Sequence, residues 1–585
     1  MADDADFQAR TFAFARHPDQ DAAAPVRRPV VVVGAGPVGL ALTIDLAQRG
    51  VPVVLLDNDD KLSTGSRAIC FAKRTLEIFD RLGVGDRVAA KGVSWNVGKV
   101  FLRDEMVYRF DLLPEPGHER PAFVNLQQFF VEGYLVERAQ RLPQVDLRWR
   151  NEIIGTEPRD DHVLLTIATP DGTYGLEADW LVACDGSRSA VRRHLALESQ
   201  GRTFRDRFLI ADVRMTHDAP AERWFWFDPA FHPNQSVLLH RQPDGVWRID
   251  FQLGWDADPE HEKKPENIMP RVKALLAHSS ALKDAEFTLE WASVYTFSCQ
   301  RMARFRHGRV LFAGDAAHGV SPFGARGANS GVQDADNLAW KLAAVVRAQA
   351  PEALLDTWAR ERETAADENI RHSTRATDFI TPKSAISRLF RDAVLTLART
   401  QPFARTLVNS GRLSTATTLH DSPLNTPDVD VFDGTMRPGA VAADARVTHA
   451  HGREDWLLRR LGDGFVALVG ADDATEHALR GVAVGDFALQ VLAVAAAPAR
   501  TLTHAPSPAS APADAHMPAP TRDARAREAL IDIDGVIARR YDLRPGTVIL
   551  LRPDAHVCAR WRAASASQVE RAMRRALAMS PEETP

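Results

Sequence analysis

A glycine-rich hexapeptide near the start of the chain has the spacing of a phosphate-binding turn. Residues 34–39 read GAGPVG and follow the apolar run 30–33, which is expected to form a buried parallel strand. Gly34 permits a tight turn, Gly36 lets the backbone approach a pyrophosphate, and Gly39 allows a helix to pack closely on the strand. Together with Pro37, these glycines predict a dinucleotide-binding βαβ unit.

The segments after this turn supply a helix and an acidic residue at the expected places. The pattern of residues 38–49 predicts a helix whose first N–H groups point at the phosphates. A second apolar run, 51–56, ends in Asp57, 18 residues past Gly39, where an acceptor for a ribose hydroxyl is expected. The pattern does not separate FAD from NAD, and a glycine-rich turn of some other α/β domain is the alternative interpretation.

Two further motifs follow apolar runs later in the chain. Asp185 and Gly186 begin the sequence DGSRS after the run 180–183, and Gly314 and Asp315 begin GDAAH after a strand expected over 310–313. A glycine-rich segment, 322–329, comes next and is expected to open a helix. Acidic residues at strand ends can accept hydrogen bonds from a nucleotide, and free N–H groups at a helix start can stabilise negative charge.

These three motifs, in this order, resemble the para-hydroxybenzoate hydroxylase and phenol hydroxylase superfamily of single-component FAD monooxygenases. The resemblance covers roughly residues 30–400, and within the superfamily the run 65–83 looks most like the 3-(3-hydroxyphenyl)propionate hydroxylases. One departure is that Asp57 is followed by Asn58, where family members often carry Glu followed by Arg. That difference puts in doubt the family's contact to the adenosine portion of FAD.

The resemblance implies a set of residues around non-covalently bound FAD. Asp315 would accept a hydrogen bond from the ribityl chain, and Pro322 would present its carbonyl close to substrate and flavin. The predicted cofactor-binding residues are Gly34, Gly36, Pro37, Gly39, Asp57, Arg67, Gln128, Asp185, Gly186, Gly314, Asp315, Pro322, Gly324, Gly327, Ala328 and Asn329. Each has a plainer alternative, such as a surface ion pair for Arg67 or a turn for Asp185. His318 is a motif marker that could simply close a local contact.

The candidates for the chemical step are less specific. Besides Pro322, His240 and Tyr295 are proposed as catalytic because they lie in the inserted sheet that should roof the substrate pocket, and Arg248 lies in the same sheet. A base or a water chain is needed because deprotonating a phenol makes its ring more nucleophilic. A buried structural role is the alternative for both side chains.

The predicted fold is α/β and has several parts. A disordered leader, 1–28, precedes a Rossmann-like FAD-binding domain over 29–200 and 301–415 that includes a helical extension. A mostly antiparallel substrate-binding β-sheet is expected to be inserted over 201–300. Residues 430–585 resemble a thioredoxin-like C-terminal domain without a C-x-x-C pair, interrupted by a flexible Ala/Pro-rich insertion over 495–520.

Composition excludes several classes of function. The net charge of −5 gives no basic field for nucleic acid, and no apolar run approaches the ~20 residues of a membrane span. Four scattered cysteines, without metal-binding spacing, suit a reducing cytoplasm and exclude a redox cysteine pair. No second nucleotide motif follows, so NAD(P)H is expected to bind transiently over the FAD domain. A homodimer is one open possibility.

The sequence therefore leads to a specific functional hypothesis. The resemblance implies an FAD-dependent monooxygenase that uses NAD(P)H and O₂ to hydroxylate a phenolic aromatic acid, such as 3-(3-hydroxyphenyl)propionate, through a flavin C4a-hydroperoxide. One alternative is a hydroxylase of the same fold acting on a larger polycyclic or quinone-like substrate. The other is a flavin-binding protein without monooxygenase turnover.

Overall fold

The chain forms two compact units. The computed structural model describes residues 7–63, 68–216, 219–279, 281–283, 285–408, 413–449, 452–497 and 529–579. The first unit comprises residues 1–114, 120–346 and 358–417, and the second comprises 115–119, 347–357 and 418–585. Every predicted site residue belongs to the first unit, which is therefore the part that positions the chemistry.

A mostly parallel sheet carries the predicted dinucleotide-binding motif of the first unit. Its main path runs β17-β18-β11-β1-β2-β8, and β1 pairs in parallel with both β11 and β2. The last four residues of β1 are buried valines, as expected for a strand covered on both faces. The strands are β1 (Val26–Val33), β2 (Val53–Leu56), β8 (Val145–Arg148), β11 (Gly172–Ala183), β17 (Arg306–His307) and β18 (Val310–Phe312), extended by β9 (Glu152–Pro158) and β10 (Val163–Thr169).

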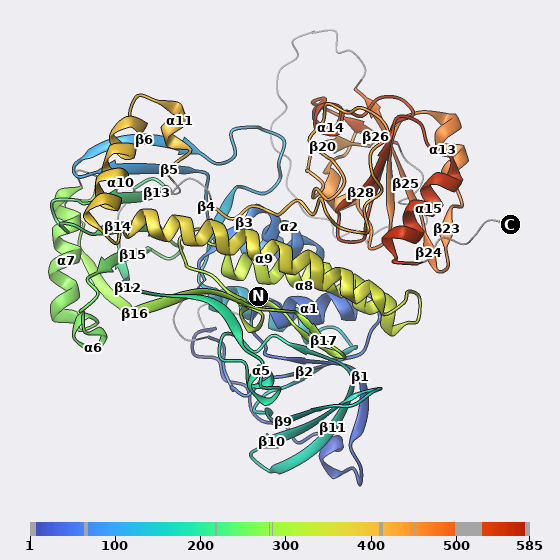
Figure 1. Ribbon diagram of the computed structural model, residues 1–585, viewed down its shortest axis with the longest axis horizontal. Helices are drawn as coiled ribbons and strands as arrows, with labels where there is room; N and C mark the ends of the chain where they lie inside the picture. The colour runs from blue at the N-terminus through green and yellow to red at the C-terminus, as the bar shows by residue number, and fades with distance from the viewer. Residues whose placement is uncertain are drawn as a thin grey trace. The chain divides into compact units, whose positions relative to one another are not determined.

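Helices cover this sheet and bring the motifs together. Helix α1 (Pro37–Gln48) packs against α8 (Gly327–Val346) and α4 (Gln128–Ala139). Figure 1 shows α9 (Ala353–Ile380) running beside α8. The remaining helices of the first unit are α2 (Lys73–Leu82), α3 (Gly85–Lys91), α5 (Ala190–His194), α6 (Pro259–Glu262), α7 (Pro265–His278), α10 (Ala385–Ala398) and α11 (Pro402–Arg405), with 3₁₀ turns η2 (Pro18–Asp21) and η3 (Gly314–Ala316).

A second sheet contains the segment that was expected to be inserted. Its order is β19-β16-β12-β15-β14-β13-β5-β6, and all of its neighbours are antiparallel except β13 and β5. The strands are β5 (Val97–Leu102), β6 (Glu105–Asp111), β12 (Ser199–Met215), β13 (Arg223–Phe227), β14 (Ser236–Arg241), β15 (Val246–Leu253), β16 (Phe287–Met302) and β19 (His318–Gly319). The predicted limits 201–300 were too narrow, because β5 and β6 come from the part assigned to the FAD-binding domain.

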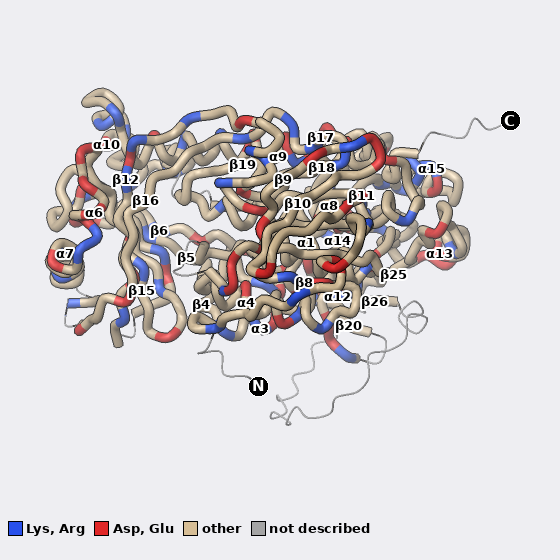
Figure 2. Tube along the Cα trace, turned by 90° about the horizontal axis from the view of Figure 1, so that it is seen from below, with Lys and Arg blue, Asp and Glu red and all other residues tan. Residues whose placement is uncertain are grey.

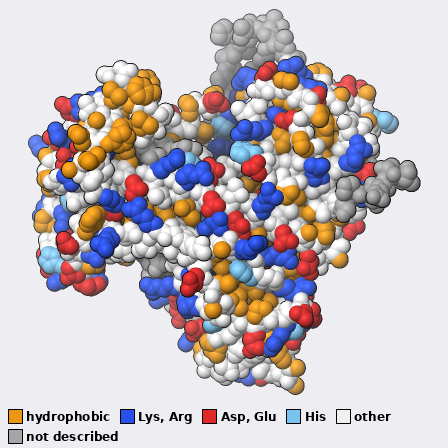
Figure 3. Space-filling model, viewed as in Figure 1, with side chains coloured by type: hydrophobic (Ala, Val, Ile, Leu, Met, Phe, Trp, Pro, Cys, Tyr) orange, Lys and Arg blue, Asp and Glu red, His pale blue; other side chains and the backbone are white. Residues whose placement is uncertain are grey.

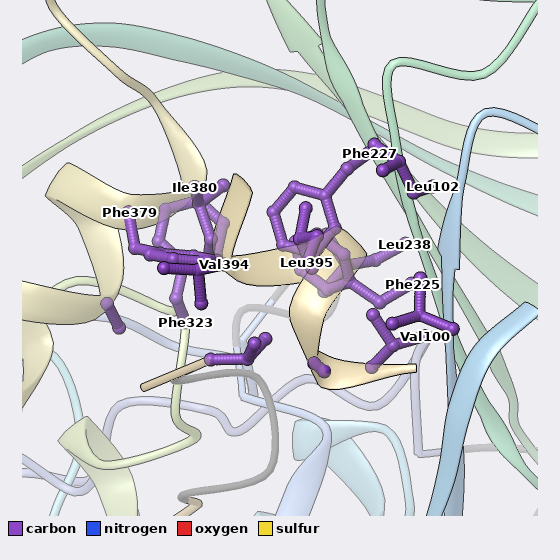
Figure 4. Packing of buried hydrophobic residues seen from close by; sticks show 14 of the residues in the cluster. Val100, Leu102, Phe225, Phe227, Leu238, Phe323, Phe379, Ile380, Val394 and Leu395 are labelled. Carbon is purple, nitrogen blue, oxygen red and sulfur yellow. The ribbon is translucent and has the colours of Figure 1, made fainter. Parts of the chain in front are cut away.

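Both faces of this second sheet are covered, but differently. One face packs its tryptophans and aliphatic residues, including Trp224, Trp247 and Phe251, on α7. The other face packs Phe225, Phe227 and Leu238 against α9 and α10, as Figure 4 shows. A small sheet with the order β3-β7-β4, comprising β3 (Cys70–Ala72), β7 (Phe123–Asn125) and β4 (Val93–Trp95), completes the unit.

The expectation of a disordered leader was wrong for its described part. Strand β1 begins at Val26, and the aromatic residues upstream are buried. Phe7 lies edge-on to Tyr134, and the ring of Phe12 stacks on Trp149. Asp19 is buried in an ion pair with Arg148 (2.7 Å). Two aromatic anchors and a buried ion pair offset the ordering entropy of this segment.

The second unit is built around a seven-stranded mixed sheet of order β21-β20-β26-β25-β22-β27-β28. Strand β25 is parallel to β22 and β26, whereas β27 is antiparallel to β22 and β28. The strands are β20 (Arg446–Thr448), β21 (Glu454–Trp456), β22 (Val466–Gly470), β25 (Gln490–Ala496), β26 (Leu530–Asp532), β27 (Val548–Leu551) and β28 (Val557–Trp561), with the hairpin β23 (Ala483–Val484) and β24 (Phe487–Ala488). The helices are α12 (Leu457–Arg460), α13 (Asp473–Leu479), α14 (Val536–Tyr541) and α15 (Ala566–Ala576).

Two predictions for this unit remain predictions. The thioredoxin-like assignment rests on the sequence resemblance alone, and the Ala/Pro-rich insertion falls, from residue 498 onward, outside the described residues. Residues 495 and 496 belong to β25. All four cysteines of the chain are free, and Cys558 is buried.

Charge and exposed apolar surface are distributed differently in the first unit. Lys and Arg are interspersed with Asp and Glu along the described chain (Figure 2). Hydrophobic side chains, in contrast, gather over α10 and α11 (Figure 3). The exposed large apolar residues there are Ile386, Leu389, Phe390, Leu397, Phe403 and Leu407.

Candidate active site

The glycine turn after β1 has the geometry that its spacing predicts. Gly34 has φ +100°, and a Cβ there would lie 2.5 Å from the carbonyl oxygen of Cys184. A Cβ on Gly39 would lie 2.0 Å from the carbonyl oxygen of Gly34. A Cβ on Gly36 would meet no atom within 4 Å, so this glycine faces open space at the start of α1. Two glycines are therefore needed by the fold, whereas Gly36 leaves room for a ligand.

Two predicted acids lie at the edge of this turn. Asp57 accepts hydrogen bonds from the N–H groups of Ala35 (2.5 Å) and Asp59 (2.8 Å), and burial raises the pKa of its carboxyl. Asp185 accepts from the N–H groups of Ala190 (2.7 Å) and Val191 (3.2 Å), which caps α5. Burial likewise raises the pKa of Asp185.

Asp185 has one oxygen left over. Its Oδ1 is buried and has no hydrogen-bond partner among the residues that the structure describes. Gly186, the next residue, has φ +77°, and a Cβ there would meet nothing within 4 Å. An unpaired buried acceptor beside open space indicates a place where a donor from a ligand or water completes the hydrogen bonding.

The Gly314 turn meets the first turn at one side chain. Gly314 has φ +61°, and a Cβ there would lie 3.0 Å from Cγ2 of Val38. Gly331 on α8 packs against the same methyl group, because a Cβ added to Gly331 would lie 2.6 Å from Cγ2 of Val38. Asp315 is exposed, and its Oδ1 lies 3.9 Å from where a Cβ of Gly327 would be. Val38 thus joins α1, the Gly314 turn and α8 into one corner.

A buried ionic cluster fixes the Gly314 turn. Asp334 on α8 accepts from the Gly314 N–H (3.0 Å) and pairs with His318 (2.7 Å) and Arg362 (2.7 Å). His318 and Asp334 are both buried. Burial alone would raise the pKa of Asp334, but His318 and Arg362 outweigh it and lower the pKa. His318 therefore makes a buried structural contact, the plainer interpretation of this motif residue.

The glycine-rich segment before α8 is held in place by its own backbone. The carbonyl oxygen of exposed Pro322 accepts hydrogen bonds from the N–H groups of Gly324 (2.8 Å) and Ala325 (3.1 Å). Gly324 in turn accepts from the Ser414 N–H (2.8 Å). Gly327 is the first residue of α8, so the free N–H groups of the helix start here.

Two predicted cofactor residues have side chains that are used by the protein itself. The Asn329 side chain accepts from the Ala72 N–H (2.8 Å) and donates to the Cys70 carbonyl (2.8 Å), which ties α8 to β3. Gln128 accepts from the Ala68 N–H (3.1 Å) and donates to Glu132 (2.8 Å). A direct FAD contact by either side chain would have to replace these bonds.

The predicted contact of Arg67 lies outside the described residues. The chain on both sides of it is anchored, because Ala68 binds Gln128 and the Ser63 N–H donates to Glu132 (2.8 Å). Ala328, the second residue of α8, is half-buried.

The two sheet residues proposed as catalytic share one face but differ in environment. His240 on β14 is 3% exposed, and burial together with Arg223 and Arg248 lowers its pKa well below the usual value. Tyr295 on β16 is 37% exposed and lies opposite Phe208. Phe208 contacts Phe323 of the glycine-rich segment, with ring centroids 4.7 Å apart. This face of the sheet therefore meets the segment that precedes α8.

Sequence reasoning missed most of the charged residues that surround His240, because it named only Arg248 among them. Arg223 lies directly opposite His240 on β13, Arg248 lies opposite it on β15, and Asp212 and Asp250 complete the group. A signal was present, because these charges interrupt strands that are otherwise aromatic and β-branched. What the sequence could not show is that they share one face.

The corner around Val38 fits an FAD diphosphate and ribityl chain. Gly36 leaves a cradle that a Cβ would fill, Asp185 carries an unpaired buried oxygen, and the first N–H groups of α1 and α8 begin beside them. Asp315 stands exposed at the same corner.

Comparison with known proteins decides the family. A family described as FAD binding domain matches residues 27–373, which is more than half of the chain. The chain belongs to this FAD-binding family. The 3-(3-hydroxy-phenyl)propionate/3-hydroxycinnamic acid hydroxylase of Escherichia coli is 32% identical over 384 residues, covering 65% of this chain and 67% of the relative. The protein is an FAD-dependent aromatic monooxygenase, of a family in which NAD(P)H is the typical electron donor.

Solved structures agree with this fold. The flavin-dependent monooxygenase PieE, in complex with FAD and substrate, covers 95% of this chain and 100% of its own, with a TM-score of 0.75 and 22% identity. The p-nitrophenol 4-monooxygenase PnpA from Pseudomonas putida DLL-E4 covers 67% of this chain and 100% of its own, with a TM-score of 0.58 and 26% identity. Within the described residues, no helix is both long and apolar enough to cross a membrane.

Proposed function

We propose that the substrate of this monooxygenase is a phenolic aromatic acid such as 3-(3-hydroxyphenyl)propionate. The observation that carries the proposal is the meeting of the glycine-rich segment before α8 with a sheet face that carries Tyr295 and a group of buried charges. A mono-aromatic ring with polar substituents needs both an apolar wall and a few fixed polar groups. The 32% identity to a hydroxylase of such an acid supports the same choice.

The protein's own residues would orient the reactants and exclude water. Bound FAD, when reduced by NAD(P)H, supplies the activation of O₂ and the transfer of one oxygen atom to the ring. The first N–H groups of α8 would stabilise negative charge on the reduced cofactor. Phe208, Phe297 and Phe323 form an apolar wall on this face of the sheet. The ring centroids of Phe297 and Phe323 are 5.4 Å apart. Such a wall keeps water away from a reactive cofactor.

A substrate screen tests this proposal. The purified protein with FAD bound would be mixed with NADH or NADPH and a panel that contains 3-(3-hydroxyphenyl)propionate, simple phenols and polycyclic phenols. We expect the phenolic acid to accelerate NAD(P)H oxidation and to yield a hydroxylated product with one oxygen atom from ¹⁸O₂.

Other outcomes would redirect the assignment. Acceleration by polycyclic phenols alone would show a hydroxylase for larger substrates. If the protein binds FAD but no phenol accelerates its oxidation of NAD(P)H, only flavin binding remains and the proposed function is overturned.

A further inference from the structure

Three polar side chains of the second sheet, two buried and one half-buried, lie on one face. Arg223 on β13 and His240 on β14 lie directly opposite each other, and Asp250 on β15 lies opposite Leu238, two residues before His240. Arg223 is 5% exposed and His240 3% exposed, while 19% of the Asp250 side chain is exposed. Adjacent strands therefore bring a cation, an imidazole and a carboxylate together away from bulk water.

The neighbouring charges are already paired. Arg248 donates from Nε and Nη2 to the two oxygens of Asp212, at 2.8 and 2.7 Å. This bidentate pair satisfies itself. Arg223 and Asp250 are the members of the group that it leaves over.

Each of the remaining side chains, and His240 between them, has one buried atom that lacks a hydrogen-bond partner in the described part of the chain. Nε of Arg223, Nδ1 of His240 and Oδ1 of Asp250 are all buried without a partner in the described part of the chain. The shortest contact between the last two residues joins His240 Nε2 to Asp250 Oδ2 at 3.9 Å. A buried donor and a buried acceptor left open on the same face of the sheet are costly unless a ligand or water completes their hydrogen bonds.

The group lies near β3, a strand that contacts the start of α8. Cys70 on β3 is close enough for Arg223, Arg248 and Asp250 to influence its pKa. The same strand is held to the start of α8 by Asn329. The open donor and acceptor thus lie near β3, the strand that is hydrogen-bonded to the first turn of α8.

We propose that Asp250 accepts the proton of the substrate's phenolic hydroxyl and that Arg223 binds the resulting phenolate oxygen. The inference rests on the proposed function and names the group that performs its proton step. The phenolic O–H bond breaks, the proton moves to the Asp250 carboxylate, and the electron pair stays on the phenolate oxygen. Arg223 remains protonated throughout, and the phenolate makes the ring a better nucleophile.

The electrostatic surroundings suit this transfer. Burial and Asp212 raise the pKa of Asp250 to about 6, against the opposing effect of Arg248 and Arg223. Asp250 is therefore largely ionised at pH 7 and yet more basic than an ordinary aspartate. A free phenol titrates near pH ~10, and an opposite charge at contact distance lowers such a value by about 1–3 units. His240 is neutral and adds no competing charge.

The test compares three variants with the wild-type holoenzyme. With 3-(3-hydroxyphenyl)propionate, we expect Asp250→Asn to lower the rate of product formation about 100-fold at pH 7. A ring-fluorinated analogue with a more acidic hydroxyl should recover much of that loss, which a merely structural role would not allow. Arg223→Gln should weaken substrate binding and the phenolate difference spectrum. Glu290→Gln, which breaks an exposed pair with Arg214 on the same sheet, is the matched control and should behave as wild type.

The wild-type pH profile decides the matter if a variant fails to fold. We expect kcat/KM to fall as the pH drops through about 6, because Asp250 is then protonated and cannot accept. Normal turnover without that acidic limb, or an Asp250→Asn variant with full FAD content and wild-type rates, would overturn the inference and leave the proposed function standing. Absence of wild-type turnover with every phenol would instead overturn the proposed function.

Discussion

Two aspartates of the first unit show how neighbouring groups decide what a carboxylate does. Both carboxylate oxygens of Asp334 have partners, which are His318, Arg362 and the Gly314 N–H. Asp250 lies near two arginines and yet keeps an open oxygen. The first arrangement holds a turn in place, whereas the second leaves a carboxylate available to a ligand. A buried acid is informative about chemistry only when its partners are counted.

At the residue scale, Asp334→Asn tests the clamp on the Gly314 turn. The variant leaves Arg362 buried without its counter-charge, which costs roughly 3–5 kcal/mol. We expect a lower melting temperature and faster loss of FAD, measured by calorimetry and by flavin fluorescence on heating. Asp367→Asn, which removes an exposed partner of Arg301, should change neither.

The same aspartate gives a pH dependence with a defined sign. Its pKa in the folded protein is lowered, so its contribution to stability is complete above the pKa of the unfolded chain. That contribution should disappear as the pH falls toward the folded-state pKa. Asp334→Asn should therefore flatten part of the acid loss of stability, and an unchanged acid profile would contradict this assignment.

At the element scale, two glycines of one turn have separable tasks. A methyl group on Gly39 would lie 2.0 Å from a backbone oxygen, so Gly39→Ala must push α1 off the turn after β1. Such overpacking typically costs about 1–3 kcal/mol. We expect Gly39→Ala to lower the stability of the apoprotein, measured by urea unfolding.

Gly36→Ala should behave in the opposite way. Its Cβ meets no protein atom within 4 Å, so the apoprotein should unfold at the same urea concentration as wild type. The methyl group would occupy the cradle for the pyrophosphate, and FAD affinity should fall about tenfold or more. Titration of the apoprotein with FAD measures this effect. Unchanged affinity would mean that the diphosphate does not lie at Gly36.

At the scale of the whole molecule, the second unit can be weakened by itself. Asp554 is fully buried between Arg552 (2.7 Å) and His556 (3.2 Å). Burial would raise the pKa of Asp554, but these two neighbours lower it well below the usual value. We expect Asp554→Asn to cost the second unit about 3–5 kcal/mol, because the buried Arg552 guanidinium loses the negative charge of the carboxylate that it contacts through Nε and Nη2.

The measurement on Asp554→Asn must distinguish unfolding of the second unit from unfolding of the first. Calorimetry should show one transition moving to lower temperature, while the FAD content stays at the wild-type level because all predicted cofactor residues belong to the first unit. Asp534→Asn, which removes the partner of Arg446 in an exposed pair, is the control. Loss of FAD from Asp554→Asn alone would contradict an independent role for the first unit.

Local sequence by itself predicted the turns that form the corner around Val38. Gly34, Gly36 and Gly39 act through their backbone geometry. That geometry depends on the strand and the helix beside them, which local sequence determines. The motifs at Asp185 and Gly314 also follow strands that the apolar runs predicted. Short-range spacing is sufficient there because each motif sits at the end of a regular element.

Only the tertiary structure decided which side chains remain open for chemistry. Asn329 and Gln128 proved to bind the protein's own backbone, and residues 7–28 proved to be anchored by Phe7, Phe12 and Asp19. Arg223 and Asp250 are 27 residues apart in sequence and come together only through the pairing of three strands. Strand order and register set which residues share a face, and long-range pairing of this kind leaves no mark in local spacing.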